Sequence, residues 1–333
     1  AGYDVAIASW FSDDEPFPDR LFVEYVKRQE LPYGENPHQR AAYYVDRTAR
    51  RDVLSMVRQH GGKALSFNNV ADLSSGRELL REFSLPGCVI VKHGNPCGVA
   101  LAATVEEAYR KALAADPDSA FGGVVVLNRG VTRELATLLA EQFVEVLFAP
   151  TYEPAALEVL AAKPNLRILE NRERRRANPG ERDLRRVMGG MLVQDLDSES
   201  EDRDMMECVT RRHPSEREWG DLIFAWRVAK HVTSNAIVIA RDLQTVGIGA
   251  GQMSRVDSVR LAVEKSEGVG GLAGGALASD AFFPFADGPE LAVKAGVTSI
   301  IQPGGSIRDD EVVAAAQEAG VVMVLTRTRH FRH

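Results

Sequence analysis

The chain has 333 residues, 45% of them hydrophobic and 26% charged, a balance typical of a soluble globular protein long enough for two domains. Its formal net charge of -7 argues against broad nucleic-acid binding, although one local basic pocket for a small anion is compatible with it. Three scattered cysteines exclude a disulfide framework and form no Cys-x-x-Cys zinc motif, so we expect a reducing, cytoplasmic setting. The sequence contains neither a membrane-length apolar run nor a signal-peptide pattern.

Residues 1–73 are rich in loop-forming residues. The opening stretch AGYDVAIASWF lacks Met and resembles the end of an element already under way, so we expect the chain to be a fragment of a longer protein. The segment YGENPHQ is predicted to be extended, because its Gly and Pro disfavour a helix.

From residue 74 onward, apolar runs typical of strands alternate with helical patterns. The first series comprises GCVIVKH, TVEEAYRKALAAD, GVVVLN, TRELATLLAEQ, VEVLFAP and EPAALEVLAAK, spread over residues 87–163. This alternation predicts an α/β fold with a covered, largely parallel sheet.

Two charged stretches interrupt the pattern. Residues 170–186 hold seven arginines and are interpreted as an exposed excursion, with a basic patch for a partner as the alternative. The acidic residues 195–205 are interpreted as a solvated loop.

A long helix is predicted over residues 215–232, where Ser215 and Glu218 have the spacing of a capping box. A second strand and helix series follows, so the order of the first half roughly recurs. We therefore favour two α/β halves over one large sheet. The predicted divisions are an N-terminal linker and substrate-binding segment (1–73), a first half (74–194) and a second half with a C-terminal tail (195–333).

Four loops combine Gly or Pro with polar groups next to predicted strands: KHGNPCG, DSAFGG, GIGAGQMSR and SDAFFPFADG. Ligands of α/β sheets bind outside the carboxyl ends of strands, which makes such loops the default site. Each loop taken alone is equally compatible with an ordinary turn, and GIGAG matches neither the dinucleotide fingerprint nor a P-loop.

Lys92 and His93 directly follow a buried strand pattern. A histidine is the usual general base near neutral pH, and a partly desolvated lysine is suited to act as an acid. The alternative is that Lys92 extends to solvent while His93 caps the turn. Cys97 is interpreted as a small packed residue, because the sequence lacks the His-x-Glu and Pro-Cys-x-x-Cys signature of a zinc deaminase.

Eight segments together make the chain resemble the AICAR transformylase domain family of bifunctional purine-biosynthesis proteins. They are YGENPHQ, VKHGNPCGVA, DSAFGG, SNAIVIARD, GIGAGQMSR, SDAFFPF, QPGGSIRDDEV and the terminal RHFRH, in this order along the chain. In that family an IMP cyclohydrolase domain precedes this one, and YDVAIASWF resembles its last residues.

The resemblance implies two cytidine-deaminase-like α/β/α subdomains without zinc. It implies formyl transfer from 10-formyltetrahydrofolate to 5-aminoimidazole-4-carboxamide ribonucleotide (AICAR) by a homodimer with shared active sites, and it leaves open a bound monovalent cation. The alternatives are a non-catalytic nucleotide-binding or scaffold subunit and, more remotely, a deaminase-type hydrolase.

The resemblance also assigns roles to individual residues. His93 is expected as the base, Lys92 as the acid and Asn235 as a group near the reacting atoms. The folate is expected at Ser254, Phe282, Pro284 and Asp287. The nucleotide is expected at Tyr33, Ser66, Phe121, Gly122, Glu145, Lys163, Arg255, Phe282, Arg329 and His333.

One position departs from the family pattern. Pro32 stands where family members commonly have an arginine that binds the nucleotide phosphate, and a proline offers neither charge nor an N–H donor. Because Pro32 supplies no charge, the positive charge for the nucleotide phosphate is expected from the terminal residues 329–333. They are predicted to enter the nucleotide site, with a frayed basic tail as the alternative. Deleting them is expected to weaken nucleotide binding at least tenfold with little change in folding stability.

Overall fold

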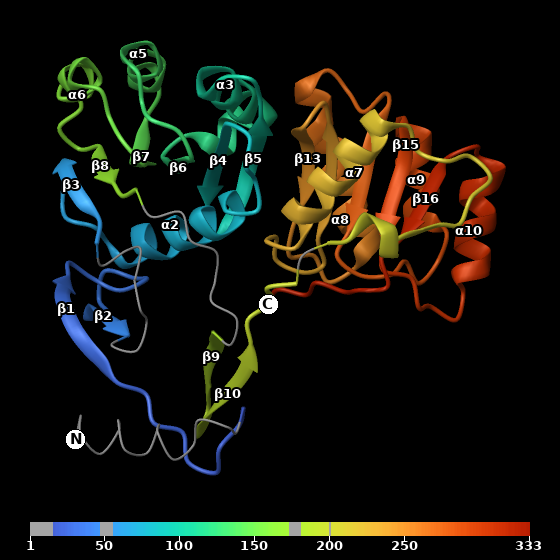
Figure 1. Cartoon of the computed structure of the whole chain (residues 1–333), viewed down its shortest axis with the longest axis horizontal. Coiled ribbons are helices and arrows are strands. Elements are labelled where there is room, and N and C mark those ends of the chain that lie inside the picture. The colour runs from blue at the N-terminus through green and yellow to red at the C-terminus, as the bar shows by residue number, and fades with distance from the viewer. Residues whose placement is uncertain (1–15, 47–55, 173–180, 200) are drawn as a thin grey trace.

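The computed structural model describes residues 16–46, 56–172, 181–199 and 201–333 (Figure 1). The opening segment quoted above lies outside these ranges. No helix within them is long and apolar enough to cross a membrane.

The first half contains a run of strands with helices between them. Its strands are β3 (Arg58–Gly61), β4 (Gly87–Lys92), β5 (Asn95–Leu101), β6 (Gly123–Leu127), β7 (Val144–Ala149) and β8 (Arg167–Glu170). Its helices are α2 (Phe67–Leu80), α3 (Val105–Ala115), α4 (Pro117–Ala120), α5 (Arg133–Glu141) and α6 (Pro154–Leu160). Thr104 and Thr132 cap α3 and α5 with their side chains, as helix-starting residues of this type do.

The second half repeats this order. Its strands are β11 (Glu207–Cys208), β12 (Ile237–Arg241), β13 (Gln244–Gly249), β14 (Gly275–Ser279), β15 (Val297–Gln302) and β16 (Val322–Leu325). Its helices are α7 (Glu216–Ala229), α8 (Arg255–Ser266), α9 (Asp287–Ala295) and α10 (Asp309–Glu318). The predicted capping box of Ser215 and Glu218 is present at the start of α7.

The strands of both halves form one 12-stranded sheet in the order β11-β16-β15-β14-β12-β13-β5-β4-β6-β7-β8-β3. The halves meet where β13 runs antiparallel to β5, through the pair Gln244 and Ala100. The α/β fold and the recurrence are confirmed, whereas the preference for two separate sheets is wrong. Two exposed sheet edges would otherwise face each other, and pairing removes both.

Helices cover both faces of the sheet. One core lies between the sheet and the helices α2 and α7 and continues across both halves; it includes Leu73, Val89 and Trp226. Two further cores lie on the opposite face, under α3, α5 and α6 and under α8, α9 and α10. Neighbouring residues of β4 alternate between the cores, with Val89 on one side and Ile90 on the other. This double coverage explains the continuous apolar composition of the central strands.

The interpretation of residues 1–73 as loop-rich is wrong in part. The described part of this region forms β1 (Tyr25–Leu31), β2 (Ala41–Asp46), β3 and the first half of α2. The pattern of α2 is hidden because its buried face includes Asn69, Ser75, Gly76 and Arg77. A Cβ atom on Gly76 would lie 2.7 Å from Val126, so the helix packs against the sheet where only a glycine fits.

The two charged stretches behave differently from each other. The described part of the arginine-rich stretch enters an exposed hairpin of β9 (Arg182–Val187) and β10 (Gly190–Asp195), which extends away from both halves in Figure 1. Residues 173–180 lie outside the described ranges. The acidic stretch is mostly exposed, as predicted for a solvated loop, but two of its residues contact the end of α7: Arg227 binds the Glu201 carboxylate at 3.0 Å and Lys230 donates to the Glu199 carbonyl. Lys230, which directly follows α7, is buried and therefore needs such a polar partner.

Candidate active site

The strand directions bring the predicted site loops to one edge of the sheet. Because β5 and β13 are antiparallel, the carboxyl ends of β4, β13, β14, β15 and β16 lie at the same edge as the amino ends of β6, β7 and β12. The rule that sites lie at carboxyl ends therefore holds for Lys92 and for the second-half residues that follow β13, β14 and β16. It fails for Asn235, which precedes β12, and for Phe121, Gly122 and Glu145, which lie at the amino ends of β6 and β7.

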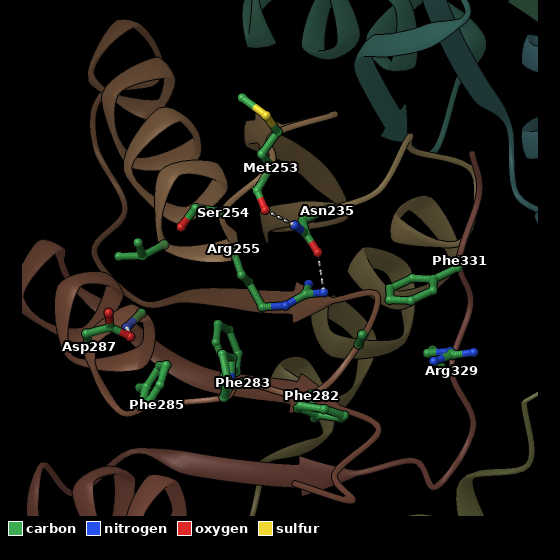
Figure 2. Close-up of a pocket in the computed structure, with 14 residues that line it drawn as sticks. Asn235, Met253, Ser254, Arg255, Phe282, Phe283, Phe285, Asp287, Arg329 and Phe331 are labelled. Atoms are coloured by element: carbon green, nitrogen blue, oxygen red, sulfur yellow. Dashed lines mark hydrogen bonds between the residues drawn. The ribbon is translucent and has the colours of Figure 1, made fainter. Parts of the chain in front are cut away.

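A pocket of about 600 Å³ lies at this edge in the second half (Figure 2). It gathers side chains from the start of α8, from the loop between β14 and α9 and from the C-terminal tail. Seven residues predicted from the sequence line it: Asn235, Ser254, Arg255, Phe282, Pro284, Asp287 and Arg329.

Asn235 and Arg255 form the polar centre of the pocket. The Asn235 amide oxygen accepts a hydrogen bond from Arg255 Nη2 at 2.7 Å, and its amide nitrogen donates to the carbonyl oxygens of Gln252 and Met253. Arg255 is buried, donates from Nη1 to Ser279 Oγ at 2.8 Å and pairs with the buried Asp280 carboxylate. This network holds the guanidinium in one orientation.

Aromatic side chains form another wall. Figure 2 shows Phe282, Phe283 and Phe285 on the loop that follows β14. Phe283 is buried, whereas Phe282 and Phe285 are exposed and available to a ligand. Asp287 begins α9 beside them. Flat aromatic faces next to a carboxylate suit a planar heterocycle that carries amino groups.

The C-terminal tail is docked, so its interpretation as a frayed segment is wrong. His330 is only 3% exposed, its Nδ1 lies 2.6 Å from Asp197 Oδ2, and its ring packs against Trp226. Arg332 donates to Ser75 Oγ at 3.1 Å and to the His231 carbonyl. These anchors place Arg329 in the pocket lining, with its guanidinium over the Phe331 ring.

His333 and two residues of the first half lie apart from the pocket lining. The His333 carbonyl accepts a hydrogen bond from Arg185 of β9 at 3.4 Å. Tyr33 is exposed in the loop after β1, next to the exposed Pro32. Lys163 is half-buried just after α6. None of these three residues is among those that line the pocket.

A second group of predicted residues lies farther along the same edge. Lys92 Nζ donates to the carbonyl oxygens of Phe121 at 2.8 Å and Gly122 at 3.0 Å. The Phe121 ring lies 5.1 Å from the Phe143 ring, and both are exposed. The prediction that Lys92 merely extends to solvent is wrong, because two carbonyl oxygens hold its ammonium group. His93 is exposed in the turn after β4.

Ser66 and Glu145 are joined by a residue that the sequence analysis did not select. Ser66 caps α2 in a reciprocal capping box with Asn69. The Asn69 amide donates to Glu145 Oε2 at 3.0 Å, and Arg167 lies 3.6 Å from the same oxygen. The spacing Ser-x-x-Asn at a helix start is the signal that identifies Asn69.

The two groups are linked by a hydrogen bond between residues that neighbour them in the sequence. Asn95 Oδ1 accepts a hydrogen bond from the Thr233 N–H at 2.9 Å. Asn95 lies two residues after His93, and Thr233 lies two residues before Asn235. Lys92 and His93 are nevertheless not among the residues that line the pocket.

Residues 1–265 match the family model described as AICARFT/IMPCHase bienzyme. The chain belongs to the AICARFT/IMPCHase bienzyme family. The resemblance drawn from the eight segments is thereby confirmed, and with it a role in purine biosynthesis. The matched range includes Lys92, His93, Asn235 and Arg255, whereas the aromatic loop and the tail lie beyond it.

Cys97 is a packed residue in this member of the AICARFT/IMPCHase bienzyme family, as predicted. Its Sγ lies 3.5 Å from the Ile90 carbonyl oxygen. Burial raises the pKa of its thiol to about 12, so the thiol stays protonated at neutral pH and is a poor nucleophile.

Proposed function

We propose that this chain transfers the formyl group of 10-formyltetrahydrofolate to the exocyclic amine of AICAR. The observation that carries the proposal is the two-part site on one sheet edge. An aromatic pocket with a fixed arginine lies on one side, and a lysine–histidine pair lies on the other. The hydrogen bond between Asn95 and Thr233 fixes the positions of the two parts along this edge within each chain.

The pocket supplies groups for both substrates. Phe282 offers an exposed aromatic face for the flat pterin, and the Asp287 carboxylate can accept hydrogen bonds from its amino group. Arg255 presents a buried, oriented guanidinium suited to the carboxamide oxygen of the nucleotide. Asn235 fixes that guanidinium, so its role in this proposal is to orient Arg255 beside the reacting groups.

Lys92 and His93 supply the proton transfers. The AICAR amine is a weak nucleophile because its lone pair is delocalised into the ring. His93 removes a proton as the amine attacks the formyl carbon. The tetrahedral intermediate then breaks its bond to folate nitrogen N10, which leaves as an amine after Lys92 protonates it. Two of the three Lys92 ammonium protons are donated to carbonyl oxygens, and the third remains for N10.

The nucleotide phosphate requires a cation that Pro32 does not provide. Arg329 lines the pocket, is exposed and is anchored through the buried His330 beside it. We assign the phosphate contact to Arg329. A charge-assisted contact of this kind contributes about 1.5–3 kcal/mol.

A homodimer is part of the same proposal. Lys92 and His93 do not line the pocket of their own chain, and Phe121 beside them is 62% exposed. A second copy that brings its pocket to this turn would complete the site and cover the exposed ring.

The formation of tetrahydrofolate from 10-formyltetrahydrofolate, with and without AICAR, tests the function. The proposal requires tetrahydrofolate and formylated nucleotide in equal amounts, and only when AICAR is present. Tight AICAR binding without turnover would instead indicate the scaffold function, which the uncharged Pro32 favours. Release of ammonia from AICAR would indicate a deaminase-type hydrolase.

A further inference from the structure

The turn that carries His93 has an unfavourable backbone conformation. Lys92 pairs with Asn95 across the hairpin, which leaves His93 and Gly94 as the two turn residues. Their φ angles are +52° and +79°, both left-handed. Hairpin turns of this kind favour Gly, Asn and Asp, so a histidine at the first position needs support from outside the turn.

Asp72 on α2 supplies that support. Its Oδ1 accepts a hydrogen bond from the Gly94 N–H at 2.7 Å. Partial burial raises the pKa of the Asp72 carboxyl group, while the Gly94 and His93 N–H groups and the charges of His93 and Lys92 act in the opposite direction. The Asp72 carboxylate therefore interacts with the backbone and with both functional side chains of the turn.

The second half contains the same device. Asp221 on α7 accepts hydrogen bonds from the N–H groups of Asp242 at 3.0 Å and Leu243 at 2.8 Å. These turn residues also have left-handed φ angles, +54° and +56°. The number of residues from the helix aspartate to the last residue of the following hairpin strand is the same in both halves: 72 to 92 at the end of β4, and 221 to 241 at the end of β12. The β12–β13 turn, however, lies at the opposite edge of the sheet, because β12 runs antiparallel to β4.

We propose that Asp72 is a positioning residue for formyl transfer. It holds the main chain of His93 in the left-handed conformation and thereby aims the imidazole and the Lys92 ammonium group at the substrates. The inference rests on the proposed function. A displacement of about 1 Å in a reacting group costs about 10²-fold in rate, so loss of this hydrogen bond reduces turnover without removing any substrate contact.

Asp221 provides a matched control for the experiment. The variants Asp72→Ala, Asp72→Asn, Asp221→Ala and Asp221→Asn are compared in kcat, in KM for both substrates and in Tm. We expect Asp72→Ala to lower kcat about 10²-fold with both KM values within about threefold. Asp221→Ala is expected to lower Tm by a similar amount while kcat stays within about threefold of the wild type. Each asparagine variant keeps one acceptor oxygen, so Asp72→Asn is expected to recover part of kcat.

Two results would overturn the positioning role. One is an Asp72→Ala enzyme with wild-type kcat. The other is an equal kcat loss in Asp221→Ala, which would reduce Asp72 to a stability contact. If Asp72→Ala does not fold, the two asparagine variants are compared in its place. Wild-type kcat in Asp72→Asn, or an equal kcat loss in Asp221→Asn, would then overturn the positioning role. An inactive wild-type chain rejects the proposed function itself, whereas an active wild type with an equally active Asp72 variant rejects only the positioning role.

Discussion

The β4–β5 turn and the β12–β13 turn occupy equivalent positions in the two halves, yet they face opposite edges of the sheet. The antiparallel pairing of β5 with β13 relates the halves in this way. The site edge consequently receives a hairpin turn from the first half and the carboxyl ends of strands from the second. One supersecondary plan thus supplies two different sets of loops to the same edge of the sheet, and the proposed function assigns proton transfer to the Lys92–His93 turn and ligand binding to the loops around Arg255.

The strongest test of this comparison removes single side chains at each of the two turns. His93→Ala and Lys92→Ala are each expected to lower turnover by about 10²- to 10⁴-fold, because a positioned acid or base is lost. Nucleotide binding, measured by calorimetry, should stay within about tenfold. Asp242→Ala, at the position equivalent to His93, is the matched control and is expected to keep its turnover. Near-normal rates in the His93 variant would remove its role as base.

The comparison also predicts complementation between chains. We expect His93→Ala and Asn235→Ala to be inactive separately and to recover about one quarter of wild-type activity when their subunits are mixed and exchanged. A shared site explains this, because each mixed dimer contains one intact site and one site with both changes. Analytical ultracentrifugation of the exchanged mixture measures whether the subunits form a dimer. No recovery from a confirmed mixed dimer means that each site is built from one chain.

Arg329 lines the pocket, whereas Arg327 does not. Comparing alanine variants of the two arginines therefore distinguishes the loss of a ligand contact from a general loss of positive charge in the tail. Arg329→Ala is expected to raise the Kd for AICAR about tenfold or more, since one phosphate contact is lost. Arg327, which pairs with Glu207 on the surface, serves as the control. This variant is preferable to deleting the tail. Deletion of the tail would also remove the buried His330, so we now expect it to lower the stability of the fold as well.

The smallest expected effect concerns the capping boxes of α2 and α7. Asn69 completes the first box with an amide that does not titrate, whereas Glu218 completes the second. Burial acts to raise the pKa of Glu218, but hydrogen bonds from Arg212 and Ser215 outweigh it and lower the pKa from 4.5 to about 2. The carboxylate therefore stabilises the fold above pH 4.5, and this contribution is lost as the pH falls toward about 2.

Glu218→Gln is the corresponding variant. It is expected to lower the urea midpoint at pH 7 and to approach the wild type as the pH falls below 4.5. A difference in midpoint that does not change with pH would show that packing, and not charge, accounts for the effect.

Much of the site could be predicted from residue patterns and the family resemblance. Turn residues beside apolar runs identified the Lys92–His93 turn, the Arg255 segment and the aromatic loop, and seven predicted residues share one pocket. Asn69, Asp72 and Asn95 were not predicted. The Ser-x-x-Asn spacing marks Asn69 as a capping residue, but its contact with Glu145 and the contacts of Asp72 and Asn95 join residues distant in sequence, which no local pattern indicates.

Local physical chemistry, read from the sequence alone, determined the helix caps, the doubly covered strands and the repeat of α/β units. These depend on neighbours a few residues apart or on the balance of apolar residues. Only the tertiary structure decided that the halves share one sheet, that the acidic stretch contacts the end of α7 and that the tail is anchored by His330. Such features depend on pairing between residues that are distant in the sequence, from about 30 to more than a hundred positions apart, where strand direction and the need to neutralise buried charge select the partners.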